Sequence, residues 1–435
     1  MSTAVIGAGW AGLAAAARLM QAGEVPHVFE AAVQPGGRAR TIHPAALGGL
    51  AMDNGQHVLL GACRRTLALM AGLGIRPADV LDVRPLKLAT LDGRFSFSLP
   101  SWRRPWNLVG SLLLSRGLGG PASWRHLQRV LQAARTPGPA MASTAADWLT
   151  SLGCPPRLLE SLWRPLALAA LNTPLEQACA SLLARLLNES LGAADAQASQ
   201  LLIPRTRLHE LWPAVVCTQL GGRLVHGRIH SLEHDGSGWR VDGQPFRQVI
   251  VATPASEAQR LLSPLDQASA ELAGWPHAQQ GAIATLTLQL EEPWPLPYPM
   301  MMLRPDDRLS INGHWLFSRC HTARSPAQRC LLHVVIARAH GIEHLGRHAA
   351  AEQIVRQIDA QSVRPLPAVR AHLLVNEKRA TFDALPGLRR PGPGTRWHGL
   401  FLAGDWTDTG YPATLEGAVC SGLQAAERAL AGQTA

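Results

Sequence analysis

The chain of 435 residues can bury one large hydrophobic core or two ordinary ones, and its 47% hydrophobic content excludes an intrinsically disordered protein. The net charge of +10 could suggest binding to nucleic acid, but all except two of the 41 basic residues are arginines, and they form no long basic run. We therefore expect no nucleic-acid partner, whereas a basic balance suits contact with anionic lipid headgroups.

The seven cysteines are an odd number and include no Cys-x-x-Cys pair, which indicates neither a disulfide framework nor a zinc site. We expect no metal, and a reducing compartment such as the cytoplasm. The sequence has no run of about 18 or more apolar residues, so no membrane-spanning helix is expected. Residues 1–17 are uncharged but lack the basic start of a signal peptide.

A glycine-rich turn follows the first predicted strand, residues 4–6, and precedes a helix predicted from about Ala11 to Met20. Gly7, Gly9 and Gly12 have the Gly-x-Gly-x-x-Gly spacing. The first glycine permits the tight turn, the second lets the backbone approach a diphosphate, and the third lets helix and strand pack closely. The N–H groups at the helix start bind the diphosphate. The predicted dinucleotide contacts here are Gly7, Gly9, Ala11 and Gly12.

A second predicted strand, residues 26–30, ends in Glu30, which lies 21 residues after Gly9. A carboxylate at this place can accept hydrogen bonds from the ribose hydroxyls of a dinucleotide. The alternatives are that Glu30 is only a surface carboxylate and that the glycines form a turn in another kind of α/β protein.

Three further segments narrow the cofactor: Gly36-Gly37-Arg38-Ala39-Arg40, Asp53-Asn54-Gly55-Gln56-His57, and residues 400–419, which include Gly404-Asp405 and Leu415-Glu416. With the glycine turn, they resemble the FAD-dependent amine oxidase and carotenoid desaturase superfamily. The strings 52–62, 403–407 and 411–418 resemble a narrower group, the bacterial squalene-associated FAD-dependent desaturases or hydroxysqualene dehydroxylases.

This resemblance implies an α/β (α+β) fold in which a discontinuous Rossmann-like FAD-binding domain carries an inserted substrate-binding domain. The expected FAD-binding parts are residues 1–75, 200–262 and 385–435, and the substrate-binding parts are 76–199 and 263–384. The family's motifs place further FAD contacts at Gly37, Arg38, Asn54, Gly55, Gln56, Val225, Gly404, Asp405 and Leu415. No cysteine lies between Asp405 and Glu416, where some amine oxidases link the flavin covalently, so we expect FAD to be bound non-covalently.

Several elements follow from pattern alone. A short strand is predicted after the glycines at 221–222, further strands at 239–241 and 248–252, and a hairpin turn at 235–238. A helix is predicted over 257–272 and an alternating strand over 282–290. Near the other end of the chain, a buried strand at 400–403 precedes a helix over 415–430.

Residues 100–135 have the composition of a membrane-facing segment. Trp102 and Trp106 accompany a leucine cluster and several arginines. Farther on, one helical face is apolar and consists of Trp124, Leu127, Val130, Leu131 and Ala134. An apolar face with tryptophan anchors and arginine flanks is typical of an interfacial helix. A core-facing amphipathic helix is an equally good interpretation.

The sequence has no nucleophile triad and no metal signature, so the reactive group should be the flavin. The resemblance implies a polyisoprenoid lipid substrate, hydroxysqualene, whose hydroxyl group leaves as water while reduced flavin delivers hydride to carbon. Such a step needs a proton donor and a dry cavity. The catalytic candidates are His57, Asp53 and Glu416. The alternatives are that His57 holds a loop, Asp53 tunes the flavin or the local structure, and Glu416 orients the last helix.

Other functions remain open from the sequence. A carotenoid-type desaturase would run the flavin in the oxidative direction, a flavin amine oxidase would act on amines, and a flavin-binding prenyl-lipid carrier would not turn over. No second dinucleotide motif of similar quality is present, so the electron donor is unidentified. A lipid substrate suggests peripheral contact with the inner face of the cytoplasmic membrane.

Overall fold

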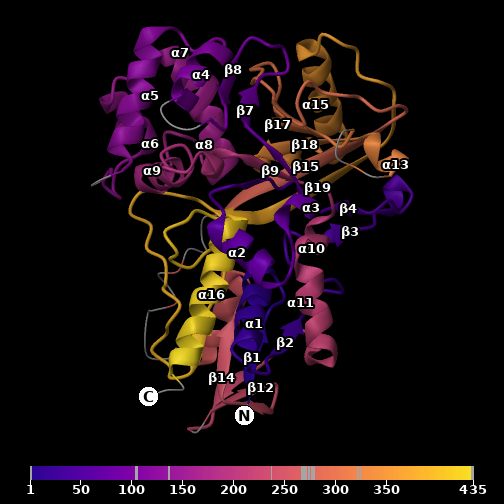
Figure 1. Ribbon diagram of the computed structural model, residues 1–435. Helices are drawn as coiled ribbons and strands as arrows, with labels where there is room; N and C mark the ends of the chain where they lie inside the picture. The colour runs from indigo at the N-terminus through magenta and orange to yellow at the C-terminus, as the bar shows by residue number, and fades with distance from the viewer. Residues whose placement is uncertain are drawn as a thin grey trace.

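The computed structural model describes residues 2–102, 106–135, 138–236, 238–265, 272, 275, 280–320, 323 and 325–432, and only the backbone at 108 and 112. Two parts are stacked along the long axis of the molecule (Figure 1). The lower part in this view contains both ends of the chain, and the upper part contains a second sheet and a group of helices.

The lower part is built on a parallel sheet of five strands. Its strand order is β10 (Leu224–His226), β2 (His27–Glu30), β1 (Thr3–Ile6), β14 (Gln248–Val251) and β20 (Leu400–Leu402). Every neighbouring pair is parallel. The strands expected near 4–6, 26–30, 224, 248–252 and 400–403 are therefore confirmed, and three distant stretches of sequence form one sheet.

Small residues let the helices of this part pack closely. Helix α1 (Trp10–Gln21) lies against α16 (Leu415–Ala431), as Figure 1 shows, and α16 also contacts α2 (Arg64–Gly72). A side chain added at Gly422 of α16 would come within 2.0 Å of the backbone oxygen of Ala11, so only glycine permits this approach. Both predicted helices are confirmed within one residue at each end.

The upper part contains an antiparallel sheet in the order β16 (Met300–Met302), β17 (Trp315–Ser318), β18 (Leu331–Ala337), β15 (Gln280–Leu290) and β19 (Val369–Phe382). The predicted strand at 282–290 is β15, which pairs with β18 on one side and β19 on the other. Helix α15 (Arg347–Gln361) buries Ile354 and Ile358 in the same apolar cluster as Leu286 and Val334 of this sheet.

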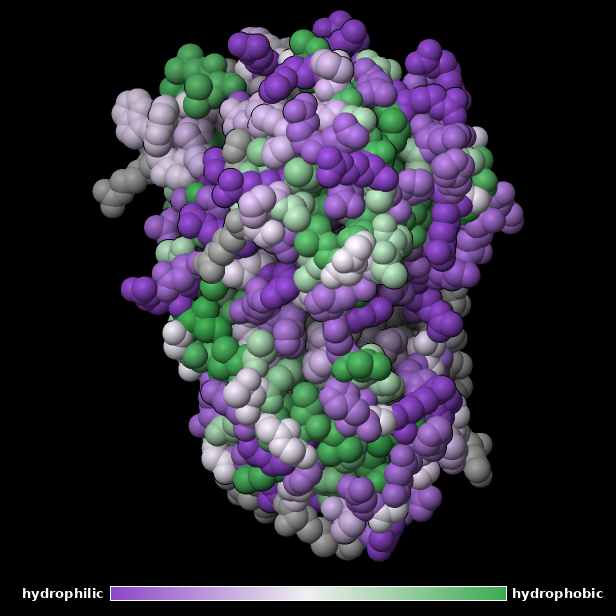
Figure 2. Space-filling model, turned by 90° about the vertical axis from the view of Figure 1, so that its right-hand side faces the viewer, coloured by the Kyte–Doolittle hydropathy of each residue, from purple (hydrophilic) through white to green (hydrophobic). Residues whose placement is uncertain are grey.

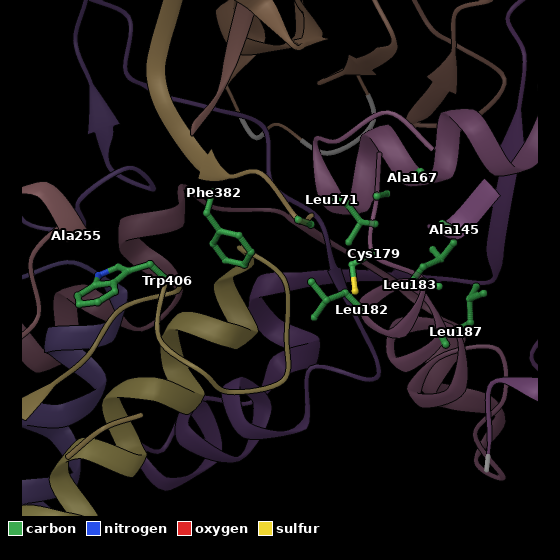
Figure 3. Close-up of a cluster of buried hydrophobic side chains, with 14 of the residues drawn as sticks. Ala145, Ala167, Leu171, Cys179, Leu182, Leu183, Leu187, Ala255, Phe382 and Trp406 are labelled. Atoms are coloured by element: carbon green, nitrogen blue, oxygen red, sulfur yellow. The ribbon is translucent and has the colours of Figure 1, made fainter. Parts of the chain in front are cut away.

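The remaining upper helices form a separate lobe with the hairpin β7 (Leu86–Ala89) and β8 (Ser96–Leu99). They are α4 (Trp106–Leu114), α5 (Pro121–Ala133), α6 (Ala145–Ser151), α7 (Pro156–Leu158), α8 (Arg164–Leu171) and α9 (Ala180–Glu189), with one π-helical turn at Leu159–Trp163. Figure 3 shows part of the core, in which Leu171 of α8 and Leu182 and Leu183 of α9 lie near Cys179, while Phe382 and Trp406 lie farther along the cluster.

Short elements connect the two parts. β5 (Leu59–Leu60) and β6 (Leu81–Arg84) pair with β9 (Leu201–Pro204), and β3 (Thr41–Ile42) pairs with β4 (Met52–Asp53). The other short elements are α3 (Pro77–Val80), α10 (Leu208–Leu211), α11 (Pro213–Leu220), β11 (Leu232–His234), β12 (Trp239–Val241), β13 (Gln244–Phe246), α12 (Ala255–Leu262), α13 (Pro326–Arg329) and α14 (Ile342–Leu345). The predicted domain limits at residues 75 and 200 lie just before β6 and β9, and these two strands pair in one small sheet. The domain limits stay a prediction.

Two expectations need correction. The helix expected over 257–272 is α12, which begins at Ala255 and ends at Leu262, followed by a 3-10 turn at Ser263–Leu265. Pro264 disfavours continuation, because proline restricts the residue before it and has no N–H to donate. Residues 266–271 of that expectation lie outside the described residues, as does residue 237 of the hairpin at 235–238.

The second concerns α5, for which a membrane-interface helix and a core-facing helix were equally good interpretations. Leu127, Val130 and Ala134 are buried in the core and Trp124 packs against it, so this is a core-facing amphipathic helix. Trp10, which lies inside the glycine motif, is buried, and its ring meets Trp212 edge to face with ring centroids 5.0 Å apart.

Candidate active site

One cavity of about 1180 Å³ runs between the two parts of the molecule. One end is bordered by the glycine turn, Glu30, Arg38 and Asp405, and the other by apolar side chains of the helical lobe and the upper sheet. The volume exceeds the range of about 300–1,000 Å³ that is typical of pockets for one small ligand. The cavity can therefore hold a dinucleotide and an apolar molecule side by side.

The glycine turn leaves the start of α1 open to this cavity. Gly7 has a φ of +106°, which favours glycine, and a side chain at Gly12 would come within 1.9 Å of the Gly7 backbone oxygen. A Cβ at Gly9 would meet only the Cα of Gly37, at 3.9 Å. Gly9, Ala11 and Gly37 all line the cavity. The free N–H groups of the first turn of α1 fit a diphosphate.

Glu30 lies at the end of β2 and lines the cavity beside the glycine turn. Its carboxylate accepts hydrogen bonds from the backbone N–H of Ala8 at 2.7 Å and of Ala32 at 2.8 Å. These two bonds fix the carboxylate, and its other lone pairs can accept ribose hydroxyls. Val225, expected nearby, pairs with Phe29 but is exposed and does not border the cavity, which is instead lined by residues 227–229.

An ion pair joins two segments that are far apart in sequence. Arg38 donates to Asp405 at 2.6 Å and also to the backbone oxygen of Ala380. Gly404, with a φ of +148°, donates its N–H to the hydroxyl of Ser421 on α16 at 2.9 Å. Arg38, Gly404 and Asp405 all line the cavity. The positive charge of Arg38 and the negative charge of Asp405 thus lie at the same end of the cavity as the glycine turn. A dinucleotide can bind both kinds of group there.

The segment after β4 is tied to the Gly-Gly-Arg segment. The backbone N–H of Asn54 donates to the oxygen of Arg40 at 2.9 Å, and its side chain donates to the oxygen of Arg38 at 3.4 Å. Asn54, Gly55, Gln56 and His57 all line the cavity. The structure thus brings together the four residues that the motif placed beside the flavin.

His57 is a neutral imidazole at physiological pH. Burial, together with the positive charge of Arg38, lowers the pKa of His57 to about 4. A neutral ring has one N–H donor and one nitrogen acceptor, so it can orient a polar group. It does not store the proton of an imidazolium. The location supports the sequence prediction, whereas the low pKa argues against His57 as the acid itself.

Asp53 faces away from the large cavity. It borders a chamber of about 10 Å³ that is also lined by Gln56, His57, Ser318 and Arg319. Its carboxylate accepts the backbone N–H of Leu208 at 2.9 Å, and burial raises the pKa of Asp53 to about 6. Asp53 therefore borders the small chamber and not the cavity that would hold a cofactor. This position favours the structural or tuning role over direct catalysis.

Glu416 lies in the first turn of α16 and is buried. It accepts hydrogen bonds from the backbone N–H of Arg65 at 2.8 Å and of Thr66 at 3.0 Å, and from the Thr66 hydroxyl at 2.6 Å. Burial raises the pKa of Glu416, and these donors oppose that effect. The carboxylate thus connects the starts of α2 and α16, which favours the alternative that it orients the last helix. Glu416 and its neighbour Leu415 both line the cavity.

The sequence predicted a dry cavity but did not identify the residues that line its apolar end. Its wall takes side chains from the hairpin, from the helical lobe and from the upper sheet: Leu86, Leu88, Phe97, Leu162, Trp163, Leu166, Leu183, Leu186, Leu187, Ile283, Trp315, Phe317 and Val335. Trp315, Val335, Thr285 and Val375 form one row across four neighbouring strands. These residues share no motif, and only their convergence in the fold identifies them.

Comparison with known proteins agrees with this geometry. The family model described as "Flavin containing amine oxidoreductase" matches residues 10–430. A hydroxysqualene dehydroxylase from Rhodopseudomonas palustris is 32% identical over 98% of each chain. Proteins of the same name from Sinorhizobium fredii and Zymomonas mobilis are 30% and 29% identical, and each match covers 98% of this chain and at least 97% of the relative.

Solved structures show the same fold at low sequence identity. An oxidoreductase from Methanosarcina mazei has a TM-score of 0.73 at 15% identity and covers 98% of this chain and 100% of its own. A putrescine oxidase variant has a TM-score of 0.73 at 16% identity and covers 99% of this chain and 98% of its own. With the family match, these likenesses establish the expected fold class and a flavin oxidoreductase that uses FAD.

Proposed function

Because the chain belongs to the flavin-containing amine oxidoreductase family, and within it to the hydroxysqualene dehydroxylases, we propose that it converts hydroxysqualene to squalene by reductive dehydroxylation. The observation that carries the proposal is the continuous cavity, whose dinucleotide end opens directly into an apolar end. A polyisoprenoid needs an apolar chamber, and the reaction needs that chamber to adjoin the cofactor.

The residues at the dinucleotide end fit FAD. The opposed glycines Gly9 and Gly37 leave a space that side chains would fill, next to the open start of α1. Arg38 and Asp405 supply a fixed pair of charges, and Glu30 a fixed carboxylate. We therefore assign the diphosphate to the glycine turn, the ribose to Glu30, and the flavin to the region of Arg38, His57 and Leu415.

In the proposed reaction, a carbon–oxygen bond of the allylic alcohol breaks and a carbon–hydrogen bond forms. FAD, when bound and reduced, would supply the hydride, and a proton would join the departing hydroxyl group to give water. Neutral His57 orients that hydroxyl group through a hydrogen bond. The apolar wall excludes bulk water, which strengthens such polar interactions and protects a carbon centre with cationic character.

The setting of the reaction also follows from the substrate. Substrate and product are both lipids, so we propose that the protein works in peripheral contact with the inner face of the cytoplasmic membrane. No helix in the described ranges combines the length and apolar character needed to cross a bilayer. A separate electron donor, not yet identified, reduces the flavin between turnovers.

A single anaerobic experiment tests the reaction. The flavin of the purified protein is photoreduced, hydroxysqualene is added in detergent, and the lipid extract is analysed by gas chromatography and mass spectrometry while flavin absorbance is followed. We expect squalene to form in step with flavin reoxidation. A reduced flavin that stays reduced, with no squalene, would refute the proposal. Loss of two hydrogens from a polyisoprenoid with oxidised enzyme would identify a desaturase instead.

A further inference from the structure

Helix α4 has its apolar and polar faces reversed relative to a helix on a water-soluble surface. Trp106 and Leu113 are 65% and 76% exposed, and Val109 and Leu114 are exposed on the same side. By contrast, Asn107 and Ser111 are 2% and 0% exposed. A surface helix in water normally turns its apolar stripe inward and its polar residues outward. The outer face of α4 is therefore built for an apolar environment.

The exposed apolar side chains are clustered and include two tryptophans. Trp102, just before α4, is 52% exposed, and its ring would lie within 2.4 Å of a side chain added at Gly110. This ring therefore lies directly against the helix. Single exposed apolar residues are common on soluble proteins, whereas a contiguous patch marks an interaction site. Tryptophan, apolar over most of its ring and polar at one N–H, favours the boundary between lipid and water.

The charged residues in the stretch of sequence that contains α4 have one sign. Between Asp92 and Asp147 the sequence contains no acidic residue and seven arginines. The structure describes five of them, and all five are exposed, namely Arg94, Arg116, Arg125, Arg129 and Arg135. An apolar patch in a stretch of sequence whose charged residues are all positive complements an anionic lipid surface. It does not suit a second copy of itself, because a two-fold contact would bring arginines against arginines.

We propose that the outer face of α4, together with Trp102, docks the protein on an anionic lipid bilayer, with the helix lying in the headgroup region. α4 packs on β8, and Phe97 of β8 lines the apolar end of the cavity. Docking therefore holds that end of the cavity close to the lipid in which a polyisoprenoid dissolves, a consequence that rests on the proposed function. The apolar face of α5 is buried in the core, so α5 contributes only its exposed arginines to this surface.

Exposed apolar residues away from α4 provide a control for the test. On the face shown in Figure 2, hydrophobic residues form small groups within a mainly hydrophilic surface. Isolated exposed valines occur elsewhere, at Val33 (91% exposed) and Val363 (90% exposed). A double substitution there removes exposed apolar area without touching α4, and so provides a matched control for a double substitution at Trp106 and Leu113.

The experiment is vesicle flotation of the flavin-loaded full chain. Vesicles are made of phosphatidylcholine alone or of phosphatidylcholine with one third phosphatidylglycerol. We expect the wild type to float with the anionic vesicles, and high salt to weaken that binding. The Trp106→Gln/Leu113→Gln variant should partition about tenfold less, because two anchors lose their apolar area. The Val33→Gln/Val363→Gln variant should partition as the wild type does. Flavin absorbance and circular dichroism check that each variant is folded.

Three outcomes would overturn the docking proposal. The first is anionic-vesicle binding that the α4 variant retains in full. The second is a wild type that does not bind these vesicles. The third is a wild-type dimer in solution that the α4 variant loses, which would assign the face to a second copy of the chain. Turnover of hydroxysqualene presented in detergent does not require docking, so its failure would count against the proposed function alone.

Discussion

The two ends of the cavity recognise their ligands in different ways. At the dinucleotide end the contacts come from glycines, backbone N–H groups and one ion pair, held within short segments of sequence. At the apolar end they come from single side chains of three separate regions. Charged and hydrogen-bonded ligands need particular groups at fixed positions, whereas apolar ligands need area and shape that many side-chain combinations supply. The first end should therefore tolerate far less change than the second.

The largest effect is expected at Gly12. In Gly12→Ala the added carbon would lie 1.9 Å from the Gly7 backbone oxygen, so α1 must move away from the turn that binds the diphosphate. We expect flavin binding to weaken by about a hundredfold or more, which corresponds to about 3 kcal/mol. Flavin content and titration of the apoprotein measure it. The control is Gly222→Ala, where an added carbon meets nothing within 4 Å. Equal flavin affinity in the two variants would contradict the comparison.

An intermediate effect, confined to substrate, is expected at Leu166. This side chain of α8 lines the apolar end and is partly buried. Leu166→Asn puts an amide where the polyisoprenoid packs, so KM should rise about tenfold while flavin affinity stays unchanged. Steady-state kinetics in detergent and flavin titration measure the two quantities. Leu166→Met, which keeps the apolar character, should behave nearly as the wild type. A parallel loss of flavin would mean that the two ends are not independent.

The smallest effect is expected at His57. Because its pKa is about 4, His57 is neutral well above that pH, and the amide of glutamine likewise offers both N–H donors and an acceptor. His57→Gln should therefore reduce turnover by less than about threefold and leave the pH profile unchanged from about pH 6 to about pH 8. A large loss of turnover with full flavin content would show instead that the imidazole carries the proton.

The same lowered pKa predicts a change in acid stability. The unfolded chain binds a proton at histidine below about pH 6.5, while folded His57 resists it until about pH 4. Stability from this group is therefore present above pH 6.5 and is lost as the pH falls toward 4. The glutamine variant should lose less stability than the wild type over that interval, as thermal unfolding at several pH values would measure.

The sequence was sufficient where structure depends on local spacing. The glycine turn, β2 ending at Glu30, and the β20 and α16 pair are confirmed, because each combines a short apolar run with a defined turn. It was insufficient where a side chain has two possible directions. Asp53 directly precedes the segment that lines the cavity, yet its carboxylate accepts the N–H of Leu208, a partner 155 residues away. No local pattern contains that information.

The two helices of residues 100–135 illustrate the same limit. Both have apolar faces with tryptophan and nearby arginine, so composition could not separate them. Their burial differs because α5 meets α9 and the core, whereas the apolar face of α4 has no such neighbour among the described residues. Which face is covered depends on the other elements of the fold.

The strand order of the parallel sheet has a consequence for biosynthesis. β1 and the glycine turn emerge early from the ribosome, but β14, β20 and α16 follow only after residues 248, 400 and 415. Domains generally fold as units during synthesis. Here the nascent chain carries an alanine-rich helix whose covering partner has not yet been translated. The cofactor therefore cannot be fully enclosed by a growing chain, and its capture is a late event in the maturation of the enzyme.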